Sequence, residues 1–385
     1  MGKKKVLQIL AGAKEYNGVS DFLLSYYSHM DREKVQFDFL FCRENTMTSK
    51  MNEPFLIGSE FIELKSRLTG KLKDSLRLIS SIQKEIERGN YDIVHINTGS
   101  ILITACGVIA ASRAKTRTII SHSHNTNPID TRVRSKTKQF FVSHINNLLR
   151  KIIIKKSTLL FACSKEAGDY LFGRRGISLE QFKIIPNAIQ TEKFLFNPNL
   201  RNKIRREYLV ENSTTVLGCV GRFSKQKNHP FLIRVFKQYQ LINGDSVLWL
   251  IGEGEEKQKI ESLVNQMGLS DKVRFFGQRN DVNELLQAFD GFVLTSFFEG
   301  LGIVAIEAQA ACLDVFIPDE VSHGSDISDL IHFIPLSAGE AAWAEEIDNK
   351  LDKERRRYDM SSIIAENGYD IKEAARLLER IYMKN

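Results

Sequence analysis

The sequence of 385 residues contains little cysteine and no cysteine pattern. Its five cysteines are Cys42, Cys106, Cys163, Cys219 and Cys312, and no two of them form a Cys-x-x-Cys pair. Disulfide frameworks and structural zinc sites need cysteines at short, repeated spacings. We therefore expect five buried thiols in a reducing cytoplasm.

Long apolar runs are also absent. The longest uncharged apolar run, residues 101–111, is far shorter than the ~20 residues that a membrane-spanning helix needs. At the N-terminus, Lys3, Lys4 and Lys5 precede a short apolar segment that Gln8 interrupts, which favours a first β-strand over a signal peptide. We expect a cytoplasmic protein.

Two ligand-binding signatures are missing as well. The chain has no Asp-x-Asp, so a metal-chelated diphosphate is not indicated, and we expect neither a metal nor another cofactor. It has no Gly-x-Gly-x-x-Gly, which argues against a nicotinamide site. The formal charge is +7, but no nucleic-acid recognition motif accompanies it, so nucleic acid is not an expected partner.

Strand and helix patterns alternate along the chain. In the first half we expect strands at 6–10, 36–42, 91–97, 118–121 and 158–163 and helices at 20–27 and 75–88. A linker at 182–189 precedes a second alternation that begins with a strand at 216–220. This pattern predicts an α/β protein with two Rossmann-like domains, residues 1–187 and 188–366, followed by a C-terminal helix within 367–385.

The most informative stretch lies at 291–310. An apolar strand is followed by a turn with Gly300 and Gly302 and then by an Ala-rich helix. The first N–H groups of such a helix favour a phosphate, and the glycines allow a ligand to approach the backbone. Glu299 and Glu307 flank this anion site, and carboxylates beside a phosphate suit hydroxyl donors. A nucleotide-diphospho sugar has both groups; two solvated glutamates are the alternative interpretation.

A second basic motif follows the strand at 216–220. Arg222 and Lys227 lie on a loop that enters a helix, where both can bind a diphosphate and stabilise the charge of a leaving nucleotide. Two histidines, His122 and His124, follow the strand at 118–121. A His-x-His pair without a third ligand is weak evidence for a metal.

These motifs, in this order, resemble those of family 4 retaining glycosyltransferases, in the branch that builds bacterial surface polysaccharides. The resemblance rests on the Glu-x7-Glu stretch at 299–307, on the Gly-Arg-x4-Lys motif at 221–227 and on Pro186-Asn187-Ala188-Ile189, which is similar to the family's interdomain linker. It implies the glycosyltransferase B architecture, GT-B, with two domains facing across a cleft and a C-terminal helix that returns to the first domain. It also implies a nucleotide-diphospho sugar donor, for which a UDP-sugar is favoured, and a glycan or lipid-linked acceptor.

The resemblance assigns roles residue by residue. Glu299 and His122 would act at the donor sugar, with His124 as the alternative histidine and a structural histidine as the alternative role. Glu299, Gly300 and Glu307 would bind the sugar and ribose. The remaining contacts are the diphosphate-binding residues Gly18, Arg222, Lys227, Gly302, Ile303 and Val304 and, near the nucleobase, Gly252 and Arg279. Gly18 lacks the paired glycine that is usual in the family, while Cys312 and Asp314 stand where the family has glycine and proline.

Segment 131–156 combines basic and apolar residues at helical spacing and contains no acidic residue. Such a helix can rest on an anionic membrane, which would place the protein peripherally at the inner face; a domain helix with solvated lysines is the alternative. Two rival functions also stay open. One is a nucleotide-sugar epimerase or phosphorylase on the same fold, and the other is a non-catalytic nucleotide-sugar-binding subunit of a transferase complex.

Overall fold

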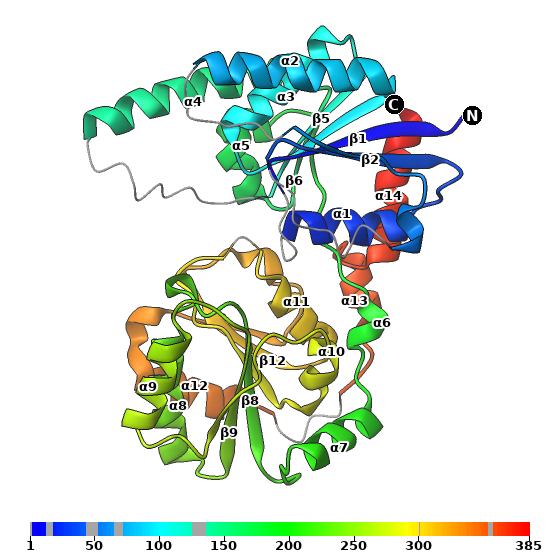
Figure 1. The fold of residues 1–385 in the computed structure, drawn as a ribbon. Helices are drawn as coiled ribbons and strands as arrows, with labels where there is room; N and C mark the ends of the chain where they lie inside the picture. Colours follow the sequence, from blue (N-terminus) through cyan, green and yellow to red (C-terminus); the bar gives the residue numbers. More distant parts are fainter. Residues whose placement is uncertain are drawn as a thin grey trace. The chain divides into compact units, whose positions relative to one another are not determined.

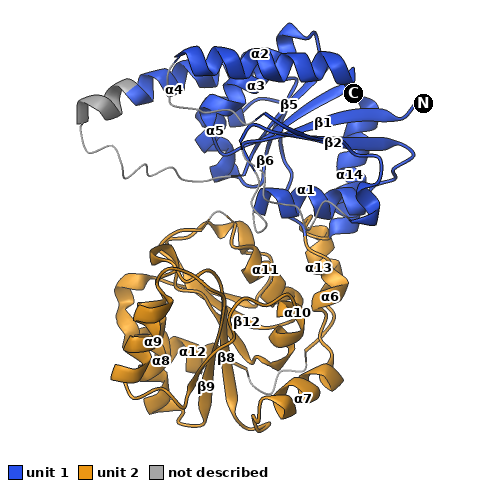
Figure 2. Cartoon of the chain, in the orientation of Figure 1, with its two compact units in different colours: residues 1–188, 371–385 blue, residues 189–370 orange. Residues whose placement is uncertain are grey.

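A computed structural model describes residues 2–12, 18–43, 53–64, 72–124, 136–299, 301–352 and 357–385, with the backbone alone for 136–141. The chain divides into two compact units (Figure 2). Unit 1 comprises residues 1–188 and 371–385, and unit 2 comprises residues 189–370. From the sequence we predict these two boundaries after residues 187 and 366, whereas in the structure they lie after residues 188 and 370.

Unit 1 is built on a parallel sheet of seven strands in the order β3-β2-β1-β4-β5-β6-β7. Its strands are β1 (Lys4–Leu10), β2 (Val35–Phe41), β3 (Phe61–Glu63), β4 (Ile93–Asn97), β5 (Thr118–Ser123), β6 (Leu159–Ala162) and β7 (Phe182–Ile184). Its helices are α1 (Gly18–Ser28), α2 (Leu72–Gly89), α3 (Ile101–Arg113), α4 (Lys136–Lys156), α5 (Lys165–Ile177) and α14 (Ile371–Lys384) (Figure 1).

Successive side chains of β1 point to opposite faces of this sheet, as the period of a strand requires. Val6 and Leu10 pack in a core with α1 and α14, whereas Leu7 and Ile9 pack in a second core with α2 and α3. The sheet is therefore covered on both faces, as the alternating pattern predicts. Gln8 lies on the α14 face and is completely buried.

The C-terminal helix α14 belongs to unit 1, which confirms the predicted return. The chain leaves unit 2 beside an isolated parallel bridge between Ile189 and Asp370. α14 then buries Ile371, Leu378 and Tyr382 in the core that contains α1. The strong amphipathicity of the tail accounts for this docking, because one apolar face of the helix needs a partner.

Unit 2 contains a parallel sheet of six strands in the order β10-β9-β8-β11-β12-β13. Its strands are β8 (Thr215–Val220), β9 (Ser246–Ile251), β10 (Val273–Phe275), β11 (Gly291–Val293), β12 (Asp314–Pro318) and β13 (Ile331–Ile334). Its α-helices are α6 (Thr191–Phe194), α7 (Pro198–Glu207), α8 (His229–Ile242), α9 (Lys257–Gln266), α10 (Val282–Leu285), α11 (Ile303–Ala310), α12 (Gly339–Lys350) and α13 (Ser361–Glu366).

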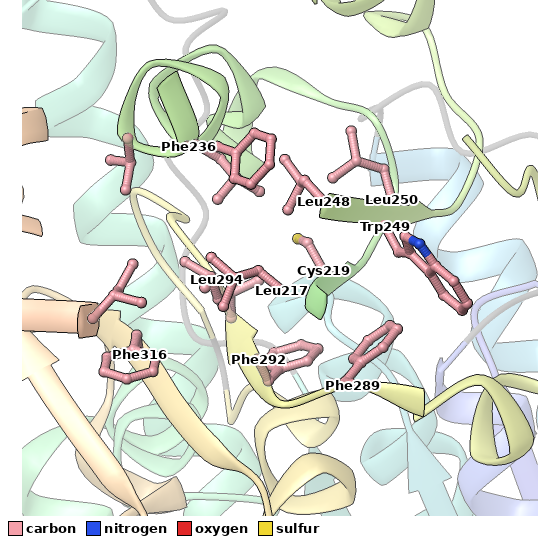
Figure 3. Packing of buried hydrophobic residues seen from close by; sticks show 14 of the residues in the cluster. Leu217, Cys219, Phe236, Leu248, Trp249, Leu250, Phe289, Phe292, Leu294 and Phe316 are labelled. Carbon is pink, nitrogen blue, oxygen red and sulfur yellow. The ribbon is translucent and has the colours of Figure 1, made fainter. Parts of the chain in front are cut away.

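The core of unit 2 is closely packed around the central strands (Figure 3). Leu217 and Cys219 of β8 lie among Leu248, Leu250 and aromatic side chains of neighbouring elements. Between them, a Cβ atom on Gly218 would lie 1.8 Å from the ring of Phe289, so this strand position requires glycine. The packing fixes the carboxyl ends of β8 and β11, which are paired strands.

Helices α1, α3, α5, α8 and α11 each follow a strand and begin at the carboxyl edge of their sheet. Loops at this edge therefore carry the predicted site residues of each unit. None of the helices in the described part of the chain is long and apolar enough to cross a bilayer. All five cysteines are buried, and none of them forms a disulfide.

Candidate active site

The loop after β8 holds the first cation of the site. A short 3-10 helix, η3 (Lys225–Lys227), connects β8 to α8. Asn228 adopts the left-handed conformation before α8, which turns the chain sharply. Gly221 lies against the stem of Lys227, since a Cβ there would lie 3.3 Å from Cε of the lysine. The lysine is thus directed along the carboxyl end of β8.

Lys227 and Glu299 form an ion pair in which Nζ and Oε1 are 2.7 Å apart. Their side chains are 17% and 9% exposed, so the pair is largely shielded from water. A buried charge needs such a partner, because removing one member of a buried pair costs about 3–5 kcal/mol. The structure therefore brings together two predicted site residues that are 72 positions apart in the sequence.

Backbone contacts hold the two loops in register. Phe297 N donates to Gln226 O at 2.9 Å, and Gln226 Nε2 donates to Phe298 O at 2.8 Å. The buried hydroxyl of Thr295 bonds to the carbonyl oxygen of Lys227 at 3.3 Å. The ion pair is thus mounted on two interlocked loops, which restricts the positions of both charges.

Helix α11 begins directly beside this pair. Gly302 has φ 66° and ψ 54°, a left-handed conformation that glycine adopts without strain. Ile303 and Val304 follow in the first turn, where backbone N–H groups have no acceptor within the helix. The helix start can therefore donate to an anion. Gly300 lies outside the described residues.

Glu307 is on the second turn of α11 and is partly buried. Burial raises the pKa of its carboxyl from an ordinary 4.5 to about 7. Among the described residues, no cation lies within ion-pair distance of it. Ionising this carboxyl therefore costs more free energy than ionising an exposed one. Hydroxyl donors from a ligand would stabilise its charge.

Arg222 is the exposed member of the basic motif, with 74% of its side chain accessible. Its Nη2 atom lies 3.0 Å from Oε2 of Glu255, another exposed side chain. The pKa of Glu255 lies below its usual value. A backbone hydrogen bond to its carboxylate lowers it most, and the guanidinium of Arg222 lowers it further. An exposed ion pair of this kind is weak, so Arg222 can exchange its partner for a phosphate.

The predicted nucleobase neighbours lie at the ends of the adjacent strands. Gly252 follows β9 with φ 146°, and a Cβ there would lie 2.0 Å from the carbonyl oxygen of Gly221. Only glycine fits this close approach of the two loops. Arg279 forms a bidentate ion pair with Asp281, at 2.7 and 2.5 Å, which lowers the pKa of that carboxyl.

In unit 1, the two histidines occupy different environments. β5 continues to Ser123, so His122 lies within the sheet, and it is 0% exposed. His124 follows the strand and is partly exposed, and its ring centroid is 4.0 Å from that of His122. Gly18 begins α1, and a Cβ there would have no neighbour within 4 Å. The structure gives His124 the more accessible position of the two.

Two further polar side chains near Lys227 were not predicted. The Ser296 hydroxyl and both ring nitrogens of His229 are buried and have no hydrogen-bond partner among the described residues. Burial lowers the pKa of His229 to about 4, with a smaller contribution from Lys227. Their only sequence signal is position, because Ser296 lies in the loop after β11 and His229 comes two residues after Lys227. In the described ranges, no group of three or more His, Cys, Asp or Glu could hold a metal.

Solved structures show the same architecture over nearly the whole chain. A HepE structure from Anabaena in complex with UDP superimposes with a TM-score of 0.69 at 18% identity, covering 98% of this chain and 95% of that one. A glycosyltransferase from Rickettsia africae ESF-5 gives a TM-score of 0.76 at 16% identity and covers 100% and 99% of the two chains. The fold is therefore the two-domain GT-B architecture, as the sequence predicts.

Sequence comparison identifies the family. Residues 16–193 match "Glycosyltransferase Family 4", and residues 201–366 match "Glycosyl transferases group 1". The chain is 30% identical to "Putative glycosyltransferase EpsF" of Bacillus subtilis (strain 168) over 99% of this chain and 96% of the relative. It is also 26% identical to an Escherichia coli UDP-Gal:alpha-D-GlcNAc-diphosphoundecaprenol alpha-1,3-galactosyltransferase. This match covers 78% of this chain and 76% of the relative. The chain therefore belongs to the glycosyltransferase family of these models and of its EpsF relative, and it is a glycosyltransferase.

Proposed function

We propose that this enzyme transfers a sugar, with retention of configuration, from a nucleotide-diphospho sugar to a glycan or lipid-linked acceptor in surface polysaccharide synthesis. The observation that carries the proposal is the shielded ion pair of Lys227 and Glu299 at the start of α11. A ligand with a diphosphate next to a polyol can satisfy both members at once. The phosphate would bind the ammonium group of Lys227, and the sugar hydroxyls would donate to the carboxylate of Glu299.

The charges in unit 2 suit the departure of a nucleoside diphosphate. Lys227, Arg222 and the N-terminus of α11 place positive charge where the leaving phosphate gains negative charge. These groups can act without a metal ion. Glu307 would bind the ribose hydroxyls, while Gly252 and Arg279 would lie near the base. A UDP-sugar is the favoured donor, which is supported by the names of the E. coli galactosyltransferase and of the HepE complex.

In unit 1, we assign the donor-facing role to His124 in preference to His122. His122 is enclosed by the sheet and is completely buried, whereas His124 is partly exposed at the strand end. Burial lowers the pKa of His124 to about 3, so its ring is neutral at physiological pH. A neutral ring can accept a hydrogen bond from a sugar hydroxyl.

A transfer assay with labelled donor and a lipid-diphosphate-linked acceptor tests the proposal. Glu299→Gln keeps the size of the side chain but removes the charge that binds Lys227 and the sugar. It should lower kcat/KM at least about tenfold, while Glu345→Gln, an exposed glutamate of α12, should leave it unchanged. Unchanged transfer in Glu299→Gln would refute the site, and product formation without acceptor would indicate the epimerase alternative.

We also propose that α4 rests on an anionic membrane, where lipid-linked acceptors reside. Val142, Ile145 and Leu148 follow one another at intervals of three residues and are 45%, 55% and 60% exposed. The exposed lysines of the same helix include Lys151 and Lys155, and its described part carries no acidic residue. Exposed apolar side chains beside basic ones match the interface of a bilayer that contains anionic lipid.

Vesicle sedimentation tests this surface. The protein should bind vesicles that contain phosphatidylglycerol more tightly than vesicles of phosphatidylcholine alone. Ile145→Glu should lose most of this binding, whereas Leu241→Glu, at an exposed leucine of unit 2, should bind like the wild type. Equal binding by the Ile145 and Leu241 variants would overturn the assignment.

A further inference from the structure

A buried hydrogen-bond circuit in unit 1 connects the C-terminal helix to His124. From α14, the hydroxyl of Tyr382 contacts Nδ1 of His95 at 2.7 Å and Nε2 of Gln8 at 3.4 Å. Gln8 Oε1 accepts from Asn97 Nδ2 at 2.8 Å, and Asn97 Oδ1 lies 3.1 Å from Nε2 of His124. The circuit therefore joins residues of β1, β4 and α14 to the end of β5.

A second branch of the circuit runs through His95. Its Nε2 atom lies 3.2 Å from Nδ1 of His122, and the two rings are parallel, with an interplanar angle of 3°. Burial lowers the pKa values of His95, His122 and His124. Each ring is thus neutral and carries one N–H and one bare nitrogen, so every hydrogen bond of the circuit has a direction.

Two opposite directions of the circuit use the hydroxyl proton of Tyr382 and satisfy each of these contacts. In the first, Gln8 donates to Tyr382, Tyr382 donates to His95, and His95 donates to His122. His124 then donates from Nε2 to Asn97 and has a bare Nδ1. In the second direction both amides are reversed, every donor becomes an acceptor, and His124 carries its proton on Nδ1.

The carbonyl group of His95 favours the first direction. Asn97 Nδ2 also donates to the carbonyl oxygen of His95 at 3.3 Å, and a reversed amide would place two oxygens there. This contact selects a bare Nδ1 on His124 and, through Gln8 and Tyr382, a proton on His122 Nε2.

We propose that Tyr382 is a positioning residue that, through Gln8 and Asn97, holds His124 in the tautomer with a bare Nδ1. This atom is buried and has no hydrogen-bond partner among the described residues. It would accept a hydroxyl of the donor sugar, so this role rests on the proposed function. The returning helix would then do more than cover the sheet, because its last turns would fix the direction of a hydrogen bond at the reaction site.

The test is the histidine nitrogen-15 spectrum of the full chain without ligand, combined with transfer kinetics. In the wild type, His124 should show a protonated Nε2 and a bare Nδ1 at neutral pH. Tyr382→Phe keeps the buried ring but removes the hydroxyl that joins Gln8 to His95. After this change, only the contact of Asn97 with the His95 carbonyl still orients the Asn97 amide. We expect mixed tautomers at His95, a partial loss of the bare Nδ1 at His124 and a loss of about 2- to 10-fold in kcat, with little change in the KM for donor.

Tyr91→Phe is the matched control. Tyr91 is another buried tyrosine of unit 1, and its hydroxyl donates to Asp38 Oδ2 at 3.0 Å, outside the circuit. It should lose stability but keep the wild-type histidine spectrum and kcat. A proton on Nδ1 of His124 in the wild type, or a Tyr382→Phe variant with the same spectrum and kcat as Tyr91→Phe, would overturn the proposal. Because the spectrum needs no donor, a failure of donor binding would refute the proposed function separately.

Discussion

The pKa of Glu307 gives a quantitative prediction about stability. Its carboxyl has a pKa of about 7 in the folded chain and an ordinary value of 4.5 when exposed. One pKa unit corresponds to about 1.4 kcal/mol, so ionisation in the folded state carries a penalty of about 3 kcal/mol, an upper value because the side chain is only partly buried. Glutamine has no such penalty at any pH.

The sign follows from linkage. A carboxyl whose pKa is raised on folding binds more protons in the folded state than in the unfolded state, so its contribution to stability is greatest below about pH 4.5. That contribution is lost as the pH rises through about 7. Relative to wild type, Glu307→Gln should therefore gain up to about 3 kcal/mol in free energy of unfolding between about pH 4.5 and pH 8.

Urea denaturation of both proteins across this pH range measures the difference. Taking the difference cancels the titration of the other carboxylates, which both proteins share. Glu345→Gln, at an exposed position, should differ little from wild type at every pH. If the difference in free energy of unfolding between Glu307→Gln and wild type stayed constant with pH, the raised pKa would be refuted. Our interpretation of this carboxyl as a group that a ligand's hydroxyl donors stabilise would then fail as well.

Three further predictions concern the site and its surroundings. Lys227→Met and Glu299→Gln should each lower the free energy of unfolding by about 3 kcal/mol, and the double variant should lose clearly less than their sum, as a double-mutant cycle in urea would measure; additive losses would contradict a shielded pair. Cys312→Gly should cost about 1–2 kcal/mol less than Cys163→Gly by thermal unfolding, because both cysteines are equally buried but only Cys312 has a positive φ, 54°; equal costs would argue against backbone strain. Excess EDTA should not change the transfer rate, because Lys227 and Arg222 supply the positive charge; a loss restored by Mg²⁺ would contradict a metal-independent reaction.

The architecture was predictable because buried parallel strands appear in the sequence as short apolar runs separated by helical patterns. The position of the basic and acidic motifs at strand ends also followed, since these ends share one edge of a sheet. The contact between Lys227 and Glu299 did not follow. It depends on the pairing of β8 with β11 and on the loop contacts through Gln226, which no local pattern contains.

The two histidines show a different limit. A strand end at residue 121 places His122 outside the sheet, but β5 continues for two more residues and encloses it. Boundaries of this kind are the least reliable part of a sequence-based prediction. The circuit from Tyr382 to His124 joins four elements, and its only local signal is the polar Gln8 within an apolar strand.

The departures from the family pattern are explained by the structure. Cys312, which stands at a family glycine, adopts the left-handed conformation that glycine would favour. Asp314, which stands at a family proline, is buried and lies 3.0 Å from Nε2 of His332. Cys312 lies in the turn between α11 and β12, and Asp314 is the first residue of β12. Both follow the end of α11, so the charged groups at its start are unaffected.

The most direct test of the central claim is donor binding by thermal shift in the presence of EDTA. A panel of UDP-, GDP-, ADP- and dTDP-sugars should contain one nucleotide series that stabilises the wild type, by about 2.7 kcal/mol at 100 times its dissociation constant. Arg222→Ala should lose this shift, whereas Arg234→Ala, which removes an ion-paired arginine of α8, should keep it. Stabilisation that is equal in both variants, or absent from the wild type with every series, would contradict a nucleotide-sugar site at the carboxyl edge of the second sheet.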